Sequence, residues 1–156
     1  MGETFVMPDA RVSEETMYVP GTDGEKMSKS KGNIINLFLP DKQLRKQIMA
    51  IQTDSTPLEE PKDTESDNVF NIYKLVASKE ETAEMKKKYE AGGFGYGHAK
   101  QALYDLLITR FEKERAQYNF YMQNPDKVEE ALAVGAEKAR KVADDVLMRV
   151  RKKLGY

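Results

Sequence analysis

The sequence predicts a mainly α-helical protein in which an all-helical part follows a short leading segment with strand character. From residue 40 onward, apolar residues recur at helical spacing between recognisable cap and stop residues. The first 39 residues lack this period and hold short apolar runs divided by proline and glycine. Of the 156 residues, 33% are charged and 40% hydrophobic, a balance typical of amphipathic helices with solvated outer faces. We therefore predict two parts, residues 1–39 and residues 40–156.

The leading segment reads as the end of a larger strand-containing unit. Residues 3–8 predict a short strand that ends at Pro8, and residues 12–19 predict either a strand or a loop. Neither can form a sheet core alone, so the chain is expected to begin in the middle of a domain, with Met1 as an introduced start. Pro20-Gly21 then begins a run of turns.

The first predicted helix spans residues 42–53 and follows a brief apolar run at residues 34–39. Pro40 ends that run, and Asp41 is expected to cap the helix. Residues 53–67 then lose all periodicity and predict a long loop. Loops of this length are often functional, and a solvated connector explains the composition equally well.

Two further helices are predicted over residues 68–77 and 79–91. The first is apolar almost all round, so it is expected to be buried. Ser78, followed three residues later by Glu81, has the spacing of a capping box that begins the second. Gly92 and Gly93 form the signal that ends the second helix.

The glycine-rich run at residues 92–97 has two readings. A phosphate-binding loop of this kind should follow a strand, whereas this one follows a helix. A tight turn between helices is therefore favoured, with Phe94 and Tyr96 holding it to the core. His98, just beyond it, is expected to be a surface or turn residue rather than a ligand.

A long helix is predicted over residues 98–124, and a final one over residues 125–154. Asn124 is expected to cap the second, with Pro125 at its first position. One side of the final helix is lined by small and apolar residues: Val128, Leu132, Gly135, Ala139, Val142, Val146 and Val150. The small residues Gly135, Ala136 and Ala139 would let a neighbouring helix approach closely. Its second half is basic, which suits the helix dipole and equally suits RNA phosphate.

Composition excludes several classes of function. Lys and Arg number 25 against 26 Asp and Glu, so the chain is not a globally basic nucleic-acid binder, although a basic face remains possible. There is no cysteine and one histidine, so we predict neither a disulfide framework nor a metal site. No apolar run has membrane-spanning length and no signal layout is present, so a cytoplasmic protein is expected.

The candidate functional residues lie in a polar loop flanked by glycines: Lys26, Met27, Ser28, Lys29 and Ser30. Two lysines three apart place compact charges on flexible stems, which suits a polyphosphate that moves during reaction. The hydroxyl groups add hydrogen-bond donors. In a lysine-rich chain, a loop of lysine and serine is usually no more than solvated surface. The full five-residue pattern nevertheless favours a functional interpretation.

These five residues are the KMSKS signature, and the chain resembles the class I aminoacyl-tRNA synthetases. Nearly all of its length, in order, is similar to the bacterial-type tryptophanyl enzymes. The Thr-Asp-Ser at residues 53–55 favours these over the sister tyrosyl enzymes. The segments that carry the resemblance are 26–31, 33–35, 40–41, Lys46, Ile48, 50–55, 68–73, 95–100 and 135–140.

The resemblance implies an activity and partners. The family activates tryptophan with ATP and Mg²⁺, releases pyrophosphate, and transfers the aminoacyl group to its tRNA (tRNA-Trp). It implies a homodimer in the cytoplasm, built from a Rossmann-like α/β catalytic domain and a C-terminal helical domain that helps recognise the anticodon. Residues 1–39 would then be the end of the catalytic domain with the KMSKS loop, and residues 40–156 the helical domain.

The resemblance also assigns roles within the loop. Lys29 is the first candidate and Lys26 the second for catalytic contact with ATP phosphate. Ser28 and Ser30 would shape the loop and donate to phosphate, and Met27 would anchor it or lie against the adenosine. All five are candidate ATP-binding residues.

One family signature is missing from the 156 residues, because no HIGH-like His-x-Gly-His sequence is present. The chain is therefore predicted to be the C-terminal part of such an enzyme, catalytically incompetent alone and without a bound cofactor. The alternatives are a free-standing helical module that binds tRNA or a protein and keeps the loop as a relic, or the equivalent part of a tyrosyl-tRNA synthetase.

Overall fold

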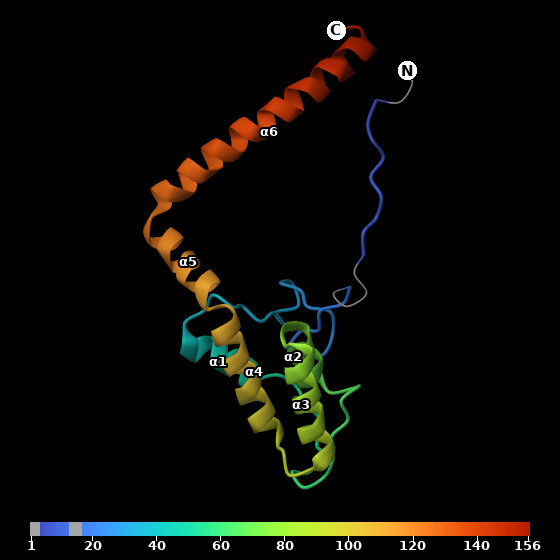
Figure 1. The fold of residues 1–156 in the computed structure, drawn as a ribbon, viewed down its shortest axis with the longest axis vertical. Helices are drawn as coiled ribbons and strands as arrows, with labels where there is room; N and C mark the ends of the chain where they lie inside the picture. The colour runs from blue at the N-terminus through green and yellow to red at the C-terminus, as the bar shows by residue number, and fades with distance from the viewer. Residues whose placement is uncertain (1–3, 13–16) are drawn as a thin grey trace. The chain divides into compact units, whose positions relative to one another are not determined.

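The computed structural model describes residues 4–12 and 17–156 and confirms a mainly α-helical protein (Figure 1). Over these residues there is no extended strand pairing beyond one isolated bridge, between Pro20 and Lys26. The helices of the described residues are α1 (Asp41–Met49), α2 (Asn68–Val76), α3 (Lys79–Ala91), α4 (Tyr96–Arg110), α5 (Glu112–Gln123) and α6 (Pro125–Leu154).

The chain divides into two compact units. One is Val12–Ala116, which holds the candidate loop together with α1 to α4. The other combines Met1–Arg11 with Gln117–Tyr156 and contains α6. The functional division predicted between residues 39 and 40 stays a prediction.

The strand expected at residues 3–8 is wrong over residues 4–8, which the structure describes as irregular backbone. A strand needs a partner for its backbone groups, and the described residues offer this segment none. Most of the second expected segment, residues 13–16, lies outside the described residues, while residues 12 and 17–19 form no strand.

The core of the larger unit lies between the first four helices. Helix α4 packs against α1 and α2, and α2 also packs against α3. The prediction that α2 is buried is confirmed. The buried apolar side chains are Leu44, Ile48, Ile51, Val69, Phe70, Ile72, Tyr73, Met85, Tyr89, Ala99, Leu103 and Leu107.

Local capping signals explain two helix starts and fail at a third. The capping box of α3 is confirmed, since Glu81 N–H donates to Ser78 Oγ at 3.1 Å and Ser78 N–H donates to Glu81 Oε2 at 2.6 Å. Asp67 caps α2 by accepting from Phe70 N–H at 2.7 Å. Asp41, however, is the first residue of α1 rather than its cap, and α1 ends at residue 49, short of the predicted residue 53.

The single helix predicted over residues 98–124 is wrong, because the chain breaks it at Phe111 into α4 and α5. Neither proline nor glycine marks this position, so tertiary contacts explain it. Phe111 packs against the core. One turn later, the Arg115 guanidinium donates to the carbonyls of Leu37 and Leu39 and pairs with Asp41 at 2.6 Å.

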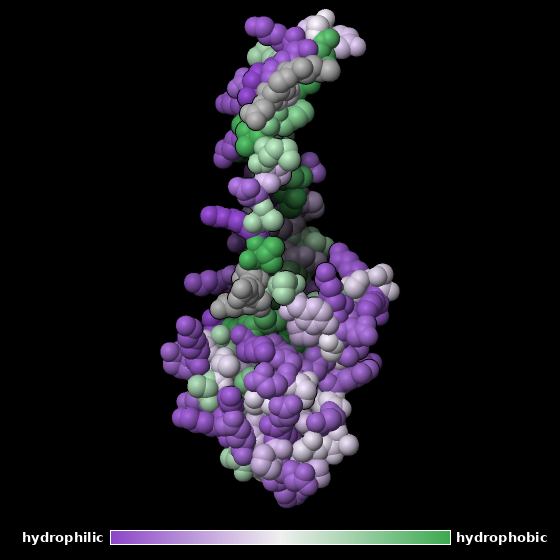
Figure 2. All heavy atoms as spheres, turned by 90° about the vertical axis from the view of Figure 1, so that its right-hand side faces the viewer, coloured by the Kyte–Doolittle hydropathy of each residue, from purple (hydrophilic) through white to green (hydrophobic). Residues whose placement is uncertain are grey.

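Helix α6 begins at Pro125 as predicted, but its capping differs. The Asn124 side chain makes no cap hydrogen bond and instead donates to Phe120 C=O at 2.7 Å. No residue of α6 is buried. The upper part of Figure 2, where α6 lies, shows exposed apolar side chains. The expected close approach of a neighbouring helix is absent within the described chain, since a Cβ at Gly135 would meet nothing within 4 Å.

The long loop before α2 is ordered around a buried lysine. Lys62 is 4% exposed, and its ammonium donates to the carbonyls of Pro57, Leu58 and Glu60 at 3.0–3.3 Å. The backbone N–H of Lys62 donates to Tyr89 C=O at 2.9 Å. Hydrogen bonds from a charged donor are among the stronger hydrogen bonds in proteins. The loop before α2 is therefore an ordered connection between helices.

The glycine-rich run is a turn between helices, as predicted. Gly92 has φ +72°, and a Cβ there would lie 2.3 Å from Glu59 C=O, so no larger residue fits. Phe94 and Tyr96 pack against the core. His98 is exposed, with its ring centroid 5.7 Å from that of Phe94.

Among the helices that the structure describes, none has the length and apolar character that crossing a membrane requires.

Candidate functional site

The candidate residues lie on a closed turn spanning residues 20–33, which we call the lysine loop. Gly21 N–H donates to Glu25 C=O at 2.7 Å, and Gly24 N–H donates back to Gly21 C=O at 3.1 Å. Met27 N–H then donates to Val19 C=O at 2.9 Å. Gly24 has φ +81°, which explains glycine at this position of the turn.

Asn33 is the centre of the lysine loop. Its side chain is 3% exposed and makes three hydrogen bonds. Nδ2 donates to Asp23 Oδ1 at 2.8 Å and to Lys26 C=O at 3.2 Å, while Oδ1 accepts from Ser28 N–H at 2.7 Å. One buried amide therefore fixes the backbone on both sides of Met27.

Close packing on Asn33 restricts the start of the loop to glycine. A Cβ added to Gly21 would lie 2.5 Å from Asn33 Cγ. Thr22 N–H donates to Asn33 C=O at 2.9 Å, and Thr22 C=O accepts from Gln52 N–H at 2.7 Å. This last bond joins the lysine loop to the segment that follows α1.

The side chains of the lysine loop divide into paired and unpaired groups. Lys31 forms an ion pair with Glu25, and this carboxylate raises the pKa of Lys31. Lys26 and Lys29 are exposed, and within the described residues neither ammonium has a carboxylate partner. Of the three lysines, the two singled out by the sequence pattern are thus the two available to an external anion.

The remaining candidates are close together. The hydroxyl groups of Ser28 and Ser30 lie 2.9 Å apart. Met27, which lies between the two lysines in the sequence, is half-buried. No cluster of three carboxylate or histidine groups suited to a metal ion occurs among the residues described. The lysine loop can therefore contact an anion such as phosphate through its lysine ammonium groups and its serine hydroxyl groups.

Replacing Asn33 with alanine is expected to unfold the lysine loop selectively. Removing the amide leaves Ser28 N–H and Lys26 C=O without their partner, which costs about 1–3 kcal/mol of the free energy of unfolding. Urea denaturation measures this loss, and hydrogen exchange at the Ser28 amide locates it. Asn36→Ala is the matched control, because the Asn36 side chain is exposed and accepts from Phe38 N–H nearby. Equal losses in both variants would contradict the central role of Asn33.

The hydrogen bond from Asn33 also lowers the pKa of Asp23, aided by backbone N–H donors. Because the folded-state pKa lies below the ordinary value of about 4, the stabilisation is present above that value. It is lost as pH falls through the lowered pKa. An NMR titration of the Asp23 carboxyl in the Asn33→Ala variant should show its pKa moving back up. An unchanged titration would exclude Asn33 as the main cause.

Comparison with known proteins identifies the class. Residues 3–112 match the family described as tRNA synthetases class I (W and Y). This covers the lysine loop and the helices α1 to α4. The chain therefore belongs to the class I tRNA synthetases of this family.

Within that family, the chain is similar to tryptophan–tRNA ligases from several bacteria. The protein of that name from Campylobacter jejuni (strain RM1221) is 46% identical over 154 residues, which is 99% of this chain and 48% of the relative. The Rhodopirellula baltica protein of that name is likewise 46% identical over 154 residues. The chain thus spans about half the length of the curated relatives it matches.

A solved structure gives the same result. The crystal structure of tryptophanyl-tRNA synthetase from Campylobacter jejuni, complexed with ADP and tryptophan, matches with a TM-score of 0.85 and 46% identity. The match covers 99% of this chain and 49% of that one. The recognition made from the sequence is confirmed.

Proposed function

We propose that this chain supplies the phosphate-contacting loop and the helical part of a tryptophan–tRNA ligase. The whole protein would activate tryptophan with ATP and then charge tRNA-Trp. The observation that carries the proposal is that the ammonium groups of Lys26 and Lys29 are exposed, have no carboxylate partner among the described residues, and lie on a backbone fixed by Asn33. The relative crystallised with ADP and tryptophan supports the choice of substrates.

The reaction needs positive charge beside the phosphates. The tryptophan carboxylate attacks the α-phosphorus, and the bond from that phosphorus to the bridging oxygen breaks. Negative charge moves onto the leaving pyrophosphate, and a cation that meets this charge as it develops lowers the barrier. We assign this role first to Lys29 and then to Lys26. The hydroxyls of Ser28 and Ser30 shape the loop and donate to phosphate, and Met27 anchors the loop or lies against the adenosine.

A chimera tests the proposal. This chain would replace the matching half of the Campylobacter jejuni relative, and ATP–pyrophosphate exchange would be measured with and without tryptophan. We expect exchange that depends on tryptophan in the chimera and background exchange in the isolated chain, which has no HIGH-like motif.

Two results would contradict the proposal. A chimera that is folded by circular dichroism but gives no tryptophan-dependent exchange would show that the lysine loop does not serve this reaction. Exchange by the isolated chain above a Lys29→Ala background would overturn its predicted incompetence.

The basic second half of α6 supports contact with tRNA. Residues 138–154 contain seven basic and two acidic residues, and their charged side chains are exposed. Such contacts release counterions, so we expect affinity for tRNA-Trp to fall about tenfold or more between 50 and 200 mM salt. Filter binding by the isolated chain measures this. Affinity that is independent of salt would exclude the electrostatic account, whereas strong binding without exchange in the chimera would favour a tRNA-binding module.

The finer properties of the whole protein follow from the same assignment. We propose that ATP acts with Mg²⁺, that the protein is a homodimer and that it works in the cytoplasm. The Mg²⁺ would be held chiefly by ATP phosphate oxygens, which is its usual mode of binding in phosphoryl-transfer sites.

A further inference from the structure

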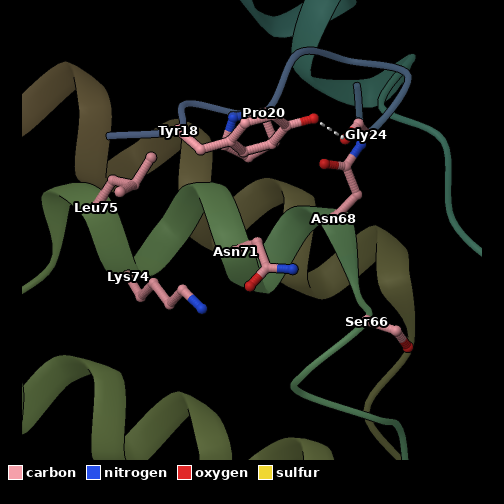
Figure 3. A pocket seen from close by; sticks show the side chains of 8 residues that line it. All are labelled: Tyr18, Pro20, Gly24, Ser66, Asn68, Asn71, Lys74 and Leu75. Atoms are coloured by element: carbon pink, nitrogen blue, oxygen red, sulfur yellow. Dashed lines mark hydrogen bonds between the residues drawn. The ribbon is translucent and has the colours of Figure 1, made fainter. Parts of the chain in front are cut away.

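One polar side chain from the helical part reaches the lysine loop. Asn68 is the first residue of α2 and is 9% exposed. Its Nδ2 donates to Gly21 C=O at 3.1 Å, across 47 positions of sequence. Figure 3 shows Asn68 projecting from the start of α2 toward the turn at Gly24. The same carbonyl also accepts from Gly24 N–H, so it is shared between the turn and α2.

The oxygen of the Asn68 side-chain amide is unpaired in the part of the chain that the structure describes. This atom, Oδ1, is buried and accepts no hydrogen bond within the described residues. Turning the amide over would place this oxygen against Gly21 C=O, where two acceptors would face each other. The Gly21 carbonyl therefore fixes the orientation of the side-chain amide.

Stability alone does not account for an asparagine at this position. One neutral hydrogen bond contributes about as much as a buried, unpaired acceptor costs. An apolar side chain of similar shape would thus fold about as well. The contribution of Asn68 is that its hydrogen bond holds Gly21 in position, and Gly21 packs closely against Asn33. Asn33 in turn holds Lys26 C=O and Ser28 N–H.

On this side the turn is also held by the Tyr18 O–H, which donates to Gly24 C=O at 3.1 Å (Figure 3). A cavity of about 410 Å³ lies beside it, between the segment before the lysine loop and α2. It is lined in part by Tyr18, Pro20, Gly24, Asn68 and Asn71 (Figure 3). Because the cavity leaves room for the turn to shift, these two side-chain hydrogen bonds restrain it more than packing does, and the one from Asn68 is the one that joins the turn to α2.

We propose that Asn68 is a positioning residue that sets the place of the lysine loop relative to the helical part. It acts on Lys26 and Lys29 through Gly21 and Asn33, without touching ATP. This inference rests on the proposed function, in which the two lysines meet ATP phosphates. Loss of the bond would leave the fold intact and misplace the charges during reaction, and small misplacements slow catalysis strongly.

The test is Asn68→Asp, compared with Asn71→Asp. Aspartate keeps the shape of asparagine but has no N–H to donate, and a negative charge in the first turn of α2 favours the helix. Asn71 lines the same cavity one turn later, and its Nδ2 donates to Glu65 C=O at 3.0 Å on the surface. It therefore controls for the charge and for the cavity.

Two measurements read the result. In the isolated chain, hydrogen exchange at the Gly24 and Met27 amides should be about tenfold faster in Asn68→Asp than in Asn71→Asp. The melting temperature of Asn68→Asp should also be the lower of the two, because its carboxylate is buried against Gly21 C=O, so exchange is compared well below both melting temperatures. In the chimera, Asn68→Asp should lower the kcat of ATP–pyrophosphate exchange about tenfold and leave the KM for tryptophan unchanged. If the role of Asn68 were only structural, the melting temperature would fall, but kcat would not fall selectively at a constant KM.

The outcomes separate the two proposals. If the two aspartate variants show the same loop exchange and the same kcat, Asn68 is not a positioning residue. Asn68→Ala provides a second check, since it removes the donor and the unpaired oxygen without adding charge, and it must also speed exchange at Gly24. If Lys29→Ala leaves the chimera fully active, the proposed function fails instead.

Discussion

Replacing Lys29 with alanine is expected to lower the kcat of tryptophan-dependent exchange in the chimera by about 10²–10³-fold. This is the usual cost of removing one preorganised group that meets charge developing in the transition state. Lys29 is exposed and has no carboxylate partner in the described part of the chain, so its loss leaves the fold unchanged. The KM for tryptophan should stay constant, because the contact is made with the transferring phosphates.

The matched control is Lys31→Ala, the same change two residues away. Lys31 is paired with Glu25, and an exposed pair of this kind contributes little to stability. We expect this variant to retain activity within a few-fold of the unchanged chimera. Lys26→Ala should fall between the two. Equal losses at residues 29 and 31 would show that the loop supplies diffuse positive charge rather than a placed ammonium.

What the sequence could predict of the fold was local. The capping box joins Ser78 and Glu81, three residues apart, so residue type and spacing are sufficient to predict it. The break at Phe111 could not be predicted in this way. It depends on Arg115 reaching the carbonyl of Leu37, 78 residues earlier in the chain, and no local signal marks such a contact.

The candidate site shows the same limit. The spacing of Lys26 and Lys29 is visible in the sequence, because the chemistry lies in their side chains. The supporting groups are less visible, since Asn33 and Asn68 bond chiefly to backbone atoms that are the same in every residue. The only sequence signal for Asn33 was its place in the resemblance, which gave it no role.

Removing the Tyr89 ring is expected to have the largest effect on stability. Tyr89 is 1% exposed, and its ring centroid lies 5.4 Å from that of Phe70, 6.0 Å from that of Phe94 and 6.4 Å from that of Tyr96. Tyr89→Ala should cost about 3–5 kcal/mol of the free energy of unfolding, because an aromatic cavity is left in the core. Urea denaturation measures the loss. The control is Tyr156→Ala, which removes a ring that is 91% exposed and should cost nothing measurable.

A second variant separates the ring from its hydroxyl group. Tyr89 O–H donates to Asp67 Oδ1 at 2.9 Å, and the same oxygen caps α2 through Phe70 N–H. Burial raises the pKa of Asp67, while the bonds from Phe70 and Tyr89 oppose that rise. Tyr89→Phe should therefore cost only about 1–2 kcal/mol and raise the pKa of Asp67 further. If it destabilises the chain as much as Tyr89→Ala does, the hydrogen bond at the cap of α2, rather than ring packing, holds this part of the core together.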